Sequence, residues 1–241
     1  MAIWLLEVIK MFYFLINDKP NTNYNFVVTK RPNIPSTSKD YNEYNVPGRD
    51  GVLYQDLGTI QDIVINIECN YISNPDTWHY RWKQIKKWIL NTGNKRLTLS
   101  DDLDYYYRIK KIEISENERK IIQSGEFTIS FTCEGYNYLI SGLNTINYTN
   151  VFNLYERSKP IYKIVGEGLC TLSVNGNDCI CNVGQNLTID TYLKICYRED
   201  GTLQNTAIKA DYNDLELIEG ENTITITEGF ELTMIPNWRC I

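Results

Sequence analysis

The chain has 241 residues, of which 43% are apolar and 22% are charged, a composition typical of one large or two ordinary globular domains. Its 24 basic and 30 acidic residues give a net charge of −6, which argues against duplex nucleic acid as a ligand, because phosphates require a basic face. His79 is the single histidine, so a two-histidine metal site is excluded and a catalytic triad has at most one candidate base.

The first residues form an apolar run over 3–16 that Glu7 and Lys10 interrupt. The run is shorter than the roughly 20 residues of a membrane span, and it lacks the basic start and cleavage site of a signal peptide. We expect residues 1–10 to be an N-terminal extension, of which a short helix is one form, in front of a first strand that begins near Met11.

Residues 32–51 differ from the segments on either side, because they are rich in proline, glycine and short polar side chains. Such a composition predicts a loop or an extended arm. The segment is longer than an ordinary connection, and loops of this length are usually functional or disordered.

Alternation of apolar and polar residues predicts half-buried strands over 63–71 and 127–133. The same pattern runs over 105–114, but its phase slips at Lys110 and Lys111, which predicts a β-bulge there.

One helix is expected between the first two of these strands. Asn74 can cap it, Pro75 suits its first turn, and Gly93 can end it. Its apolar stripe, with Trp88 beside it, is formed by Trp78, Trp82, Ile85 and Ile89. We interpret this stripe as a core face and His79 next to it as a packing or surface residue rather than a ligand.

The two parts of the chain differ in charge, since residues 1–140 are neutral and residues 141–241 carry the net charge of −6. We therefore predict a first domain over 11–140, a linker over 141–159 and a second domain over 160–241. Many short strands without helices predict a β-sandwich for the second domain, with Gly166 to Gly168 as a hairpin turn.

The odd number of cysteines, seven, favours buried free thiols in a reducing compartment over a disulfide framework. Cys179 and Cys181 form a C-x-C pair, and no second pair stands at the spacing of a zinc ribbon. We expect neither a metal nor a cofactor.

The densest acidic cluster is Asp101, Asp102 and Asp104. A calcium loop is excluded, because Tyr107 stands where the loop requires glycine. A glycosidase carboxylate pair remains an alternative, but a polar turn before a strand is favoured. The chain has no phosphate-binding, dinucleotide-binding or nucleophile-elbow motif, so we predict that it is not an enzyme.

Several motifs follow one another in a recognisable order. They are Phe12 to Asp18, Val46-Pro47-Gly48-Arg49-Asp50-Gly51, the helix around Trp82 to Ile89, Lys95 to Asp102, Tyr105 to Tyr107, Phe127 to Cys133, Tyr136 to Tyr138, Pro160 to Gly168, Asn175-Gly176, Ile189-Asp190 and Ile235 to Arg239. From Met11 to Ile241 the sequence resembles the distal tail protein (Dit) family of long-tailed, non-contractile bacteriophages.

This resemblance implies a mainly β fold. The N-terminal domain would be a β-sandwich or barrel-like body with one α-helix and an extended arm. The C-terminal domain would be a galectin-like or jelly-roll β-sandwich, similar to carbohydrate-binding modules.

The resemblance also implies a structural virion protein of the phage tail tip, made and assembled in the bacterial cytoplasm, without membrane insertion. It would form a homo-hexameric ring at the distal end of the tail tube, with DNA passing through the channel. Its partners would be the tail tube protein, the tape-measure protein, the tail-tip hub or tail-associated lysin, and receptor-binding proteins. The alternative is an extracellular β-sandwich protein that binds or hydrolyses glycans, for which five tryptophans and 18 tyrosines supply aromatic side chains.

Five residues are predicted to form a subunit clasp at the tip of the arm: Pro47, Gly48, Arg49, Asp50 and Gly51. The alternative is that they form only a local turn. The length of the loop and the family resemblance favour the clasp.

Overall fold

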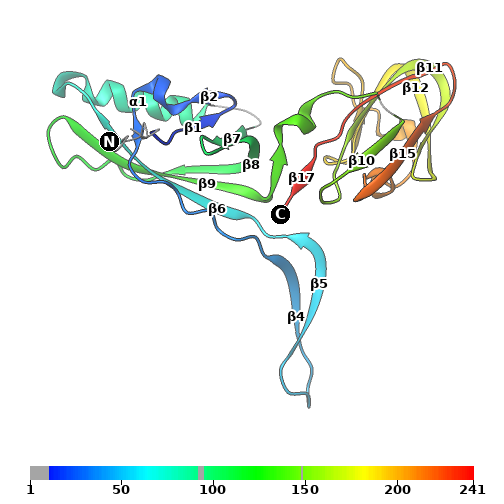
Figure 1. Ribbon diagram of the computed structural model, residues 1–241, viewed down its shortest axis with the longest axis horizontal. Helices are drawn as coiled ribbons and strands as arrows, with labels where there is room; N and C mark the ends of the chain where they lie inside the picture. Colours follow the sequence, from blue (N-terminus) through cyan, green and yellow to red (C-terminus); the bar gives the residue numbers. More distant parts are fainter. Residues whose placement is uncertain (1–10, 92–94, 148) are drawn as a thin grey trace, which may run out of the picture. The chain divides into compact units, whose positions relative to one another are not determined.

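The structure is a computed structural model that describes residues 11–91, 95–147 and 149–241. The chain divides into two compact units, unit 1 (Met1–Asn137) and unit 2 (Tyr138–Ile241). The predicted extension over 1–10 and the predicted helix stop at Gly93 lie outside the described residues. Strands dominate both units, and the described residues of unit 1 form one α-helix, which confirms the mainly β prediction (Figure 1). Within the described ranges, no helix has the length and apolar character needed to cross a membrane.

Unit 1 is built on an antiparallel sheet whose strands follow the order β2-β1-β7-β8-β9-β6-β3. The strands are β1 (Phe14–Ile16), β2 (Lys19–Pro20), β3 (Val27–Val28), β6 (Ile63–Ile72), β7 (Lys95–Leu99), β8 (Asp102–Ile114) and β9 (Ser124–Leu139). Strand β6 pairs along its whole length with β9, from Ile63 opposite Cys133 to Ile72 opposite Ser124. The odd-numbered residues of β6 from Ile63 to Tyr71 are buried, so the predicted alternation is confirmed.

The phase slip in β8 is visible in its packing. Tyr107 and Ile109 contact the core of unit 1 before the slip, and Ile112 and Ile114 contact the same core after it. Odd-numbered residues face the core before the slip and even-numbered residues face it afterwards. In a regular strand these would lie on opposite faces, so the strand changes phase between Ile109 and Ile112.

Helix α1 (Trp78–Leu90) closes the core of unit 1 on one face of the sheet (Figure 1). The Asn74 side chain accepts a hydrogen bond of 3.1 Å from the backbone N–H of Asp76, at the start of the 3₁₀ turn η2 (Pro75–Thr77) that leads into α1. The other 3₁₀ turn of this unit is η1 (Asn21–Tyr24).

The predicted apolar stripe of α1 is the face that packs on the sheet. Trp78, Ile85 and Ile89 are buried, and Trp82 is half-buried against the same core. Trp88, next to the stripe, stacks on Tyr24 with ring centroids 4.4 Å apart.

Unit 2 is a β-sandwich with a core of its own. Its strands are β10 (Asn150–Asn153), β11 (Ile161–Val174), β12 (Asn177–Asp190), β13 (Ile195–Tyr197), β14 (Ile208–Lys209), β15 (Gly220–Ile226) and β16 (Glu231–Ile235). Strand β17 (Arg239–Cys240) pairs with β9 and is not part of the sandwich. The 3₁₀ turns are η3 (Ile140–Leu143), η4 (Asn205–Ala207) and η5 (Tyr212–Leu215). A long hairpin, β11–β12, forms its centre and turns at Asn175 and Gly176, whose φ angles of 54° and 84° suit the two-residue turn of a twisted hairpin.

Two details differ from the sequence predictions for unit 2. The predicted linker 141–159 contains β10, which pairs with β15 inside the sandwich. The predicted turn at Gly166 to Gly168 is wrong, because these residues continue β11 opposite β12. Glycine is needed at Gly166 for close packing, since a Cβ there would stand 2.3 Å from the ring of Phe230.

All seven cysteines are free, and all except the partly buried Cys240 are buried. Burial raises the pKa of Cys133 to about 12 and that of Cys196 to about 11, with smaller effects from neighbouring charges and hydrogen bonds. These thiols therefore stay protonated at neutral pH, and protonated buried thiols react slowly.

We expect thiol titration of the denatured, unreduced protein to count seven thiols, and titration of the native protein to modify Cys240 first. A count of one, three or five in the denatured protein would mean that disulfides form. Because the pKa values of Cys133 and Cys196 are raised by folding, stability should also fall as the pH rises above the ordinary thiol value of 9.0.

Candidate functional site: the β4–β5 arm

A two-stranded hairpin separate from the large sheet forms the arm, defined here as residues 39–60 (Figure 1). It consists of β4 (Lys39–Asn45) and β5 (Val52–Ile60), in antiparallel register from Asn45 opposite Val52 to Lys39 opposite Ile60. The composition predicted a loop or arm over 32–51, and β5 was not predicted. The β-branched Val52 and the aromatic Tyr54, both common in strands, were the available signal.

The five residues of the predicted clasp lie at the tip of the arm. The backbone N–H of Arg49 donates to the Val46 carbonyl oxygen at 3.2 Å, which closes a turn with Pro47 and Gly48 at its centre. Gly48 has a φ of 81°, so proline followed by glycine is the pair that a type II turn requires. The side chains of Arg49 and Asp50 are exposed and make no ion pair with any described residue.

The root of the arm is attached to the large sheet of unit 1. The backbone N–H of Gln61 donates to the Ser38 carbonyl oxygen at 2.9 Å, and the Thr37 hydroxyl donates to the Gly135 carbonyl oxygen of β9 at 2.9 Å. A Cβ at Gly135 would stand 2.3 Å from the Gln61 carbonyl oxygen, so glycine is required for this close approach.

An irregularity in β5 lies near the root. The register shifts between Lys39 and Tyr41, and Gly58 takes a φ of 68°. The Asp56 carboxylate accepts a hydrogen bond of 2.8 Å from the Gly58 backbone N–H and pairs with the Lys39 ammonium at 2.9 Å. The first of these contacts is the main cause that lowers the pKa of Asp56, and the second adds to it. Together they define a bulge at a fixed point of the arm.

We expect Gly135→Ala to disturb the root of the arm, because the added methyl group overlaps the Gln61 backbone and the Ile60 side chain. Overpacking of this kind costs about 1–3 kcal/mol of stability. Thermal unfolding together with amide hydrogen exchange checks this, with faster exchange expected at Gln61. Gly176→Ala in the turn of the β11–β12 hairpin is a control: alanine is strained there by the φ of 84°, but exchange at Gln61 should not change. Unchanged exchange at Gln61 would show that the close approach is not needed.

The arm exposes an unusual number of large apolar side chains for so small a sheet. Each of them is at least 42% exposed: Tyr41, Tyr44, Val46, Leu53, Tyr54 and Leu57. An isolated two-stranded hairpin is at best marginally stable in water, and exposed apolar patches mark interaction sites. The arm is therefore the strongest candidate for a functional surface in the part of the chain that the structure describes.

The other residues singled out from the sequence lie elsewhere. His79 is exposed on α1, with its ring edge-on to Trp78 at 5.0 Å. Asp101 lies in the turn between β7 and β8, where its carboxylate is 3.5 Å from the Arg31 guanidinium. Partial burial raises the pKa of Asp102, and the neighbouring carboxylates of Asp101 and Asp104 raise it further. Asp101 therefore lies in the predicted polar turn, whereas Asp102 and Asp104 already belong to β8.

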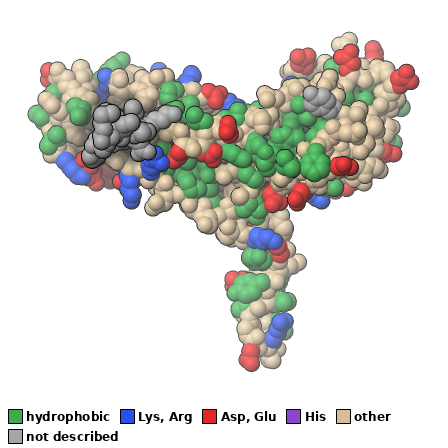
Figure 2. Space-filling model, in the orientation of Figure 1, with side chains coloured by type: hydrophobic (Ala, Val, Ile, Leu, Met, Phe, Trp, Pro, Cys, Tyr) green, Lys and Arg blue, Asp and Glu red, His purple; other side chains and the backbone are tan. Residues whose placement is uncertain are grey.

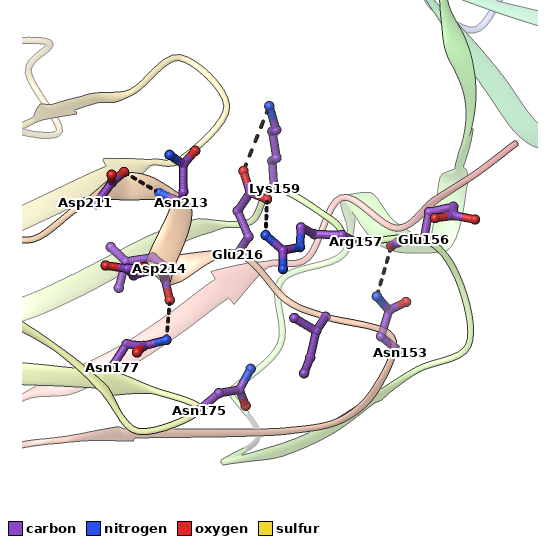
Figure 3. A network of polar contacts seen from close by, with 12 residues as sticks. Asn153, Glu156, Arg157, Lys159, Asn175, Asn177, Asp211, Asn213, Asp214 and Glu216 are labelled. Atoms are coloured by element: carbon purple, nitrogen blue, oxygen red, sulfur yellow. Dashed lines mark hydrogen bonds and ion pairs between the residues drawn. The ribbon is translucent and has the colours of Figure 1, made fainter. Parts of the chain in front are cut away.

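A polar network in unit 2 was not predicted from the sequence (Figure 3). The buried Glu216 carboxylate lies between the Arg157 guanidinium at 3.8 Å and the Lys159 ammonium at 3.9 Å. Asp211 accepts a hydrogen bond from the Asn213 backbone N–H at 2.9 Å, which caps η5. These contacts hold the segment before β15 in place, which is a structural role.

No group of three or more histidine, cysteine or acidic side chains in residues 11–91, 95–147 and 149–241 is arranged to hold a metal ion. Hydrophobic side chains also gather on the surface away from the arm (Figure 2). The arm differs in that its apolar residues belong to a sheet with no core of its own.

Comparison with known proteins finds similarity in structure alone. No protein-family model matches the chain, and no curated protein matches it. Among solved structures, the chain is similar to the crystal structure of the Dit protein (gp 19.1) of phage SPP1, described as a paradigm of the hub adsorption apparatus in phages that infect Gram-positive bacteria. The TM-score is 0.67 at 12% sequence identity, covering 96% of this chain and 100% of that one. The chain thus has the fold of a phage distal tail protein, as the sequence resemblance implied.

Proposed function

We propose that this chain is a structural protein of a phage tail and builds a ring at the distal end of the tail tube. The observation that carries the proposal is the arm, an exposed apolar hairpin on a fold shared along nearly the whole chain with a phage Dit protein. Both units have complete cores of their own, so the exposed arm is best explained by a partner molecule.

The proposed ring is closed and contains six copies, with the arm of each copy bound to a neighbour. An arm that leaves one body and contacts a different surface of the next is a head-to-tail contact, and such contacts close into rings when the rotation allows it. The tip residues Arg49 and Asp50 are free to pair with charges of the neighbour.

The proposed partners of the ring are the tail tube protein, the tape-measure protein, the tail-tip hub with its lysin, and receptor-binding proteins. The protein would act in the virion, without catalysis and without a cofactor. Turnover of peptidoglycan by the purified protein, abolished by Asp101→Asn or Asp102→Asn, would contradict the non-enzymatic part of this proposal.

We expect Arg49→Ala to weaken ring assembly and leave the thermal midpoint of the monomer nearly unchanged. The side chain makes no ion pair within the described chain, and an exposed charge contributes little to folding. Loss of one partner of an interfacial charge pair costs about 2–5 kcal/mol of binding free energy, and this loss is repeated at every contact between copies in the ring. Sedimentation velocity over a range of concentrations measures the effect. Lys83→Ala, which removes an exposed charge on α1, is the matched control. If Arg49→Ala and Lys83→Ala assemble equally well, Arg49 does not contribute to the clasp.

A further inference from the structure

Glycine follows an aspartate or an asparagine at three places in the chain: Asp50-Gly51, Asn175-Gly176 and Asp200-Gly201. Such a pair can react with itself, because the backbone nitrogen of the glycine can attack the side-chain carbonyl carbon of the residue before it. Glycine favours this attack, since it has no Cβ to obstruct the approach and its backbone rotates most freely. Whether the two groups can meet therefore depends on the contacts that hold them in the folded chain.

In the pair Asp200-Gly201, hydrogen bonds hold both reacting groups. The Thr202 backbone N–H donates to the Asp200 carboxylate at 2.9 Å, and the Gly201 backbone N–H donates to the Arg198 carbonyl oxygen at 2.8 Å. The contact with Thr202 is also the main cause that lowers the pKa of Asp200. A carboxyl group must be protonated before it can lose its hydroxyl as water, so a lowered pKa slows the reaction further.

In the pair Asn175-Gly176, hydrogen bonds fix the side chain that would be attacked. The Asn175 side-chain Nδ2 donates to the Asn222 side-chain oxygen at 2.8 Å, and the Asn175 Oδ1 accepts from the Thr223 backbone N–H at 2.9 Å. Turning the amide carbon towards the Gly176 nitrogen would break both of these contacts. The fold of unit 2 therefore protects both of its pairs.

The pair Asp50-Gly51, at the tip of the arm, has no such protection. Both residues are exposed, and no described residue forms a hydrogen bond or an ion pair with the Asp50 carboxylate or the Gly51 backbone N–H. The space beside Gly51 is open, since no atom beyond its two chain neighbours lies within 4 Å of the missing Cβ. Gly51 also precedes β5, which begins at Val52. The nitrogen and the carboxyl group are thus both left free to react.

We propose that Asp50 is a site of spontaneous isomerisation to isoaspartate in the unassembled chain. The Gly51 nitrogen forms a bond to the Asp50 side-chain carbon, its proton passes to water, and the carboxyl hydroxyl leaves as a water molecule. The product is a cyclic succinimide. Water then adds to one of the two carbonyl groups of this ring and opens it. Opening at the main-chain carbonyl gives isoaspartate, and opening at the other carbonyl restores aspartate. Water is the only co-reactant, and the water released in the first step balances the water taken up in the second.

Isomerisation changes the shape of the arm tip. The backbone of isoaspartate runs through the former side chain, so the chain gains one carbon atom between Arg49 and Gly51. This extra atom lies directly after the turn that the Arg49 backbone N–H closes on the Val46 carbonyl oxygen. The carboxylate moves onto the old main-chain carbon, and the entry into β5 is displaced. The inference concerns the unassembled chain and does not rest on the proposed ring.

Mass-spectrometric peptide mapping of the purified full chain, kept dilute at neutral pH, tests this inference. Electron-transfer fragmentation distinguishes isoaspartate from aspartate at each position, and isotopically labelled water marks every ring that has opened. The same measurement on the chain unfolded in urea gives the reactivity of each pair without structure. We expect folding to slow the reactions at Asp200 and Asn175 by about tenfold or more, because hydrogen bonds must break first. At Asp50 we expect similar rates in the folded and the unfolded chain.

Asp50→Glu is the matched control variant. It keeps the negative charge at the tip, but its longer side chain has to close a larger ring, which forms more slowly. The isomerised product at position 50 should therefore disappear, with the rate at Asp200 unchanged. If folding slows the reaction at Asp50 as strongly as at Asp200, the tip is not free and the inference is overturned. Reaction of the folded chain at Asp200 or Asn175 but not at Asp50 would overturn it as well.

Discussion

Replacing residues 40–59 by the dipeptide Asn-Gly should give a folded protein that no longer forms rings. Lys39 and Ile60 are directly opposite each other at the root of the arm, so a two-residue turn can join them without moving Ser38 or Gln61. No residue of the deleted segment belongs to the core of unit 1 or of unit 2, so the thermal midpoint should change little. Every proposed contact between copies is removed, so assembly should be lost altogether.

Sedimentation velocity and thermal unfolding of the same preparation measure both parts of this result. A matched control keeps the arm and replaces two exposed apolar residues of unit 2, Leu169→Ser with Ile180→Ser. That variant should still assemble. Rings of normal mass from the armless protein would show that copies associate through another surface.

Trp88→Ala should cause the largest loss of stability in unit 1, about 3–5 kcal/mol. The Trp88 side chain is 6% exposed and packs against the rings of Tyr24, Phe14 and Phe26, with centroids 4.4, 6.1 and 5.8 Å away. Its removal leaves a cavity among rigid aromatic neighbours that cannot collapse to fill it.

Urea unfolding followed by circular dichroism measures this loss. Trp82→Ala should cost less, because Trp82 is half-buried, although its ring is parallel to that of Tyr71. Lys87→Ala, at the neighbouring exposed position, is the control. A loss below about 1 kcal/mol for Trp88→Ala would mean that α1 does not seal the core.

Regular elements with one buried face could be predicted from the sequence. Burial of every second residue of β6, and of Trp78, Ile85 and Ile89 on α1, follows directly from the periods of strand and helix. The prediction was wrong where glycine serves packing rather than a turn. Gly166 and Gly168 have the composition of a turn, but they lie within β11, where the missing Cβ of Gly166 leaves room for the Phe230 ring.

The arm was harder to predict from the sequence than the cores of the two units. Proline and glycine at Pro47, Gly48 and Gly51 indicated the tip of the arm, because they are required by the turn itself. The partner strand β5 carries apolar residues on both faces, so it lacks the alternation by which strands are recognised. The exposed apolar side chains of β5 belong to the surface on which the proposed role of the arm depends.

The central claim, that this chain is a ring-forming tail protein, is tested most directly by native mass spectrometry of the purified protein. The proposed function predicts a closed assembly with six times the 28.1 kDa mass of one chain, with no larger species as concentration rises. A mass of 28.1 kDa at every concentration tested, or an open series of growing oligomers, would contradict it.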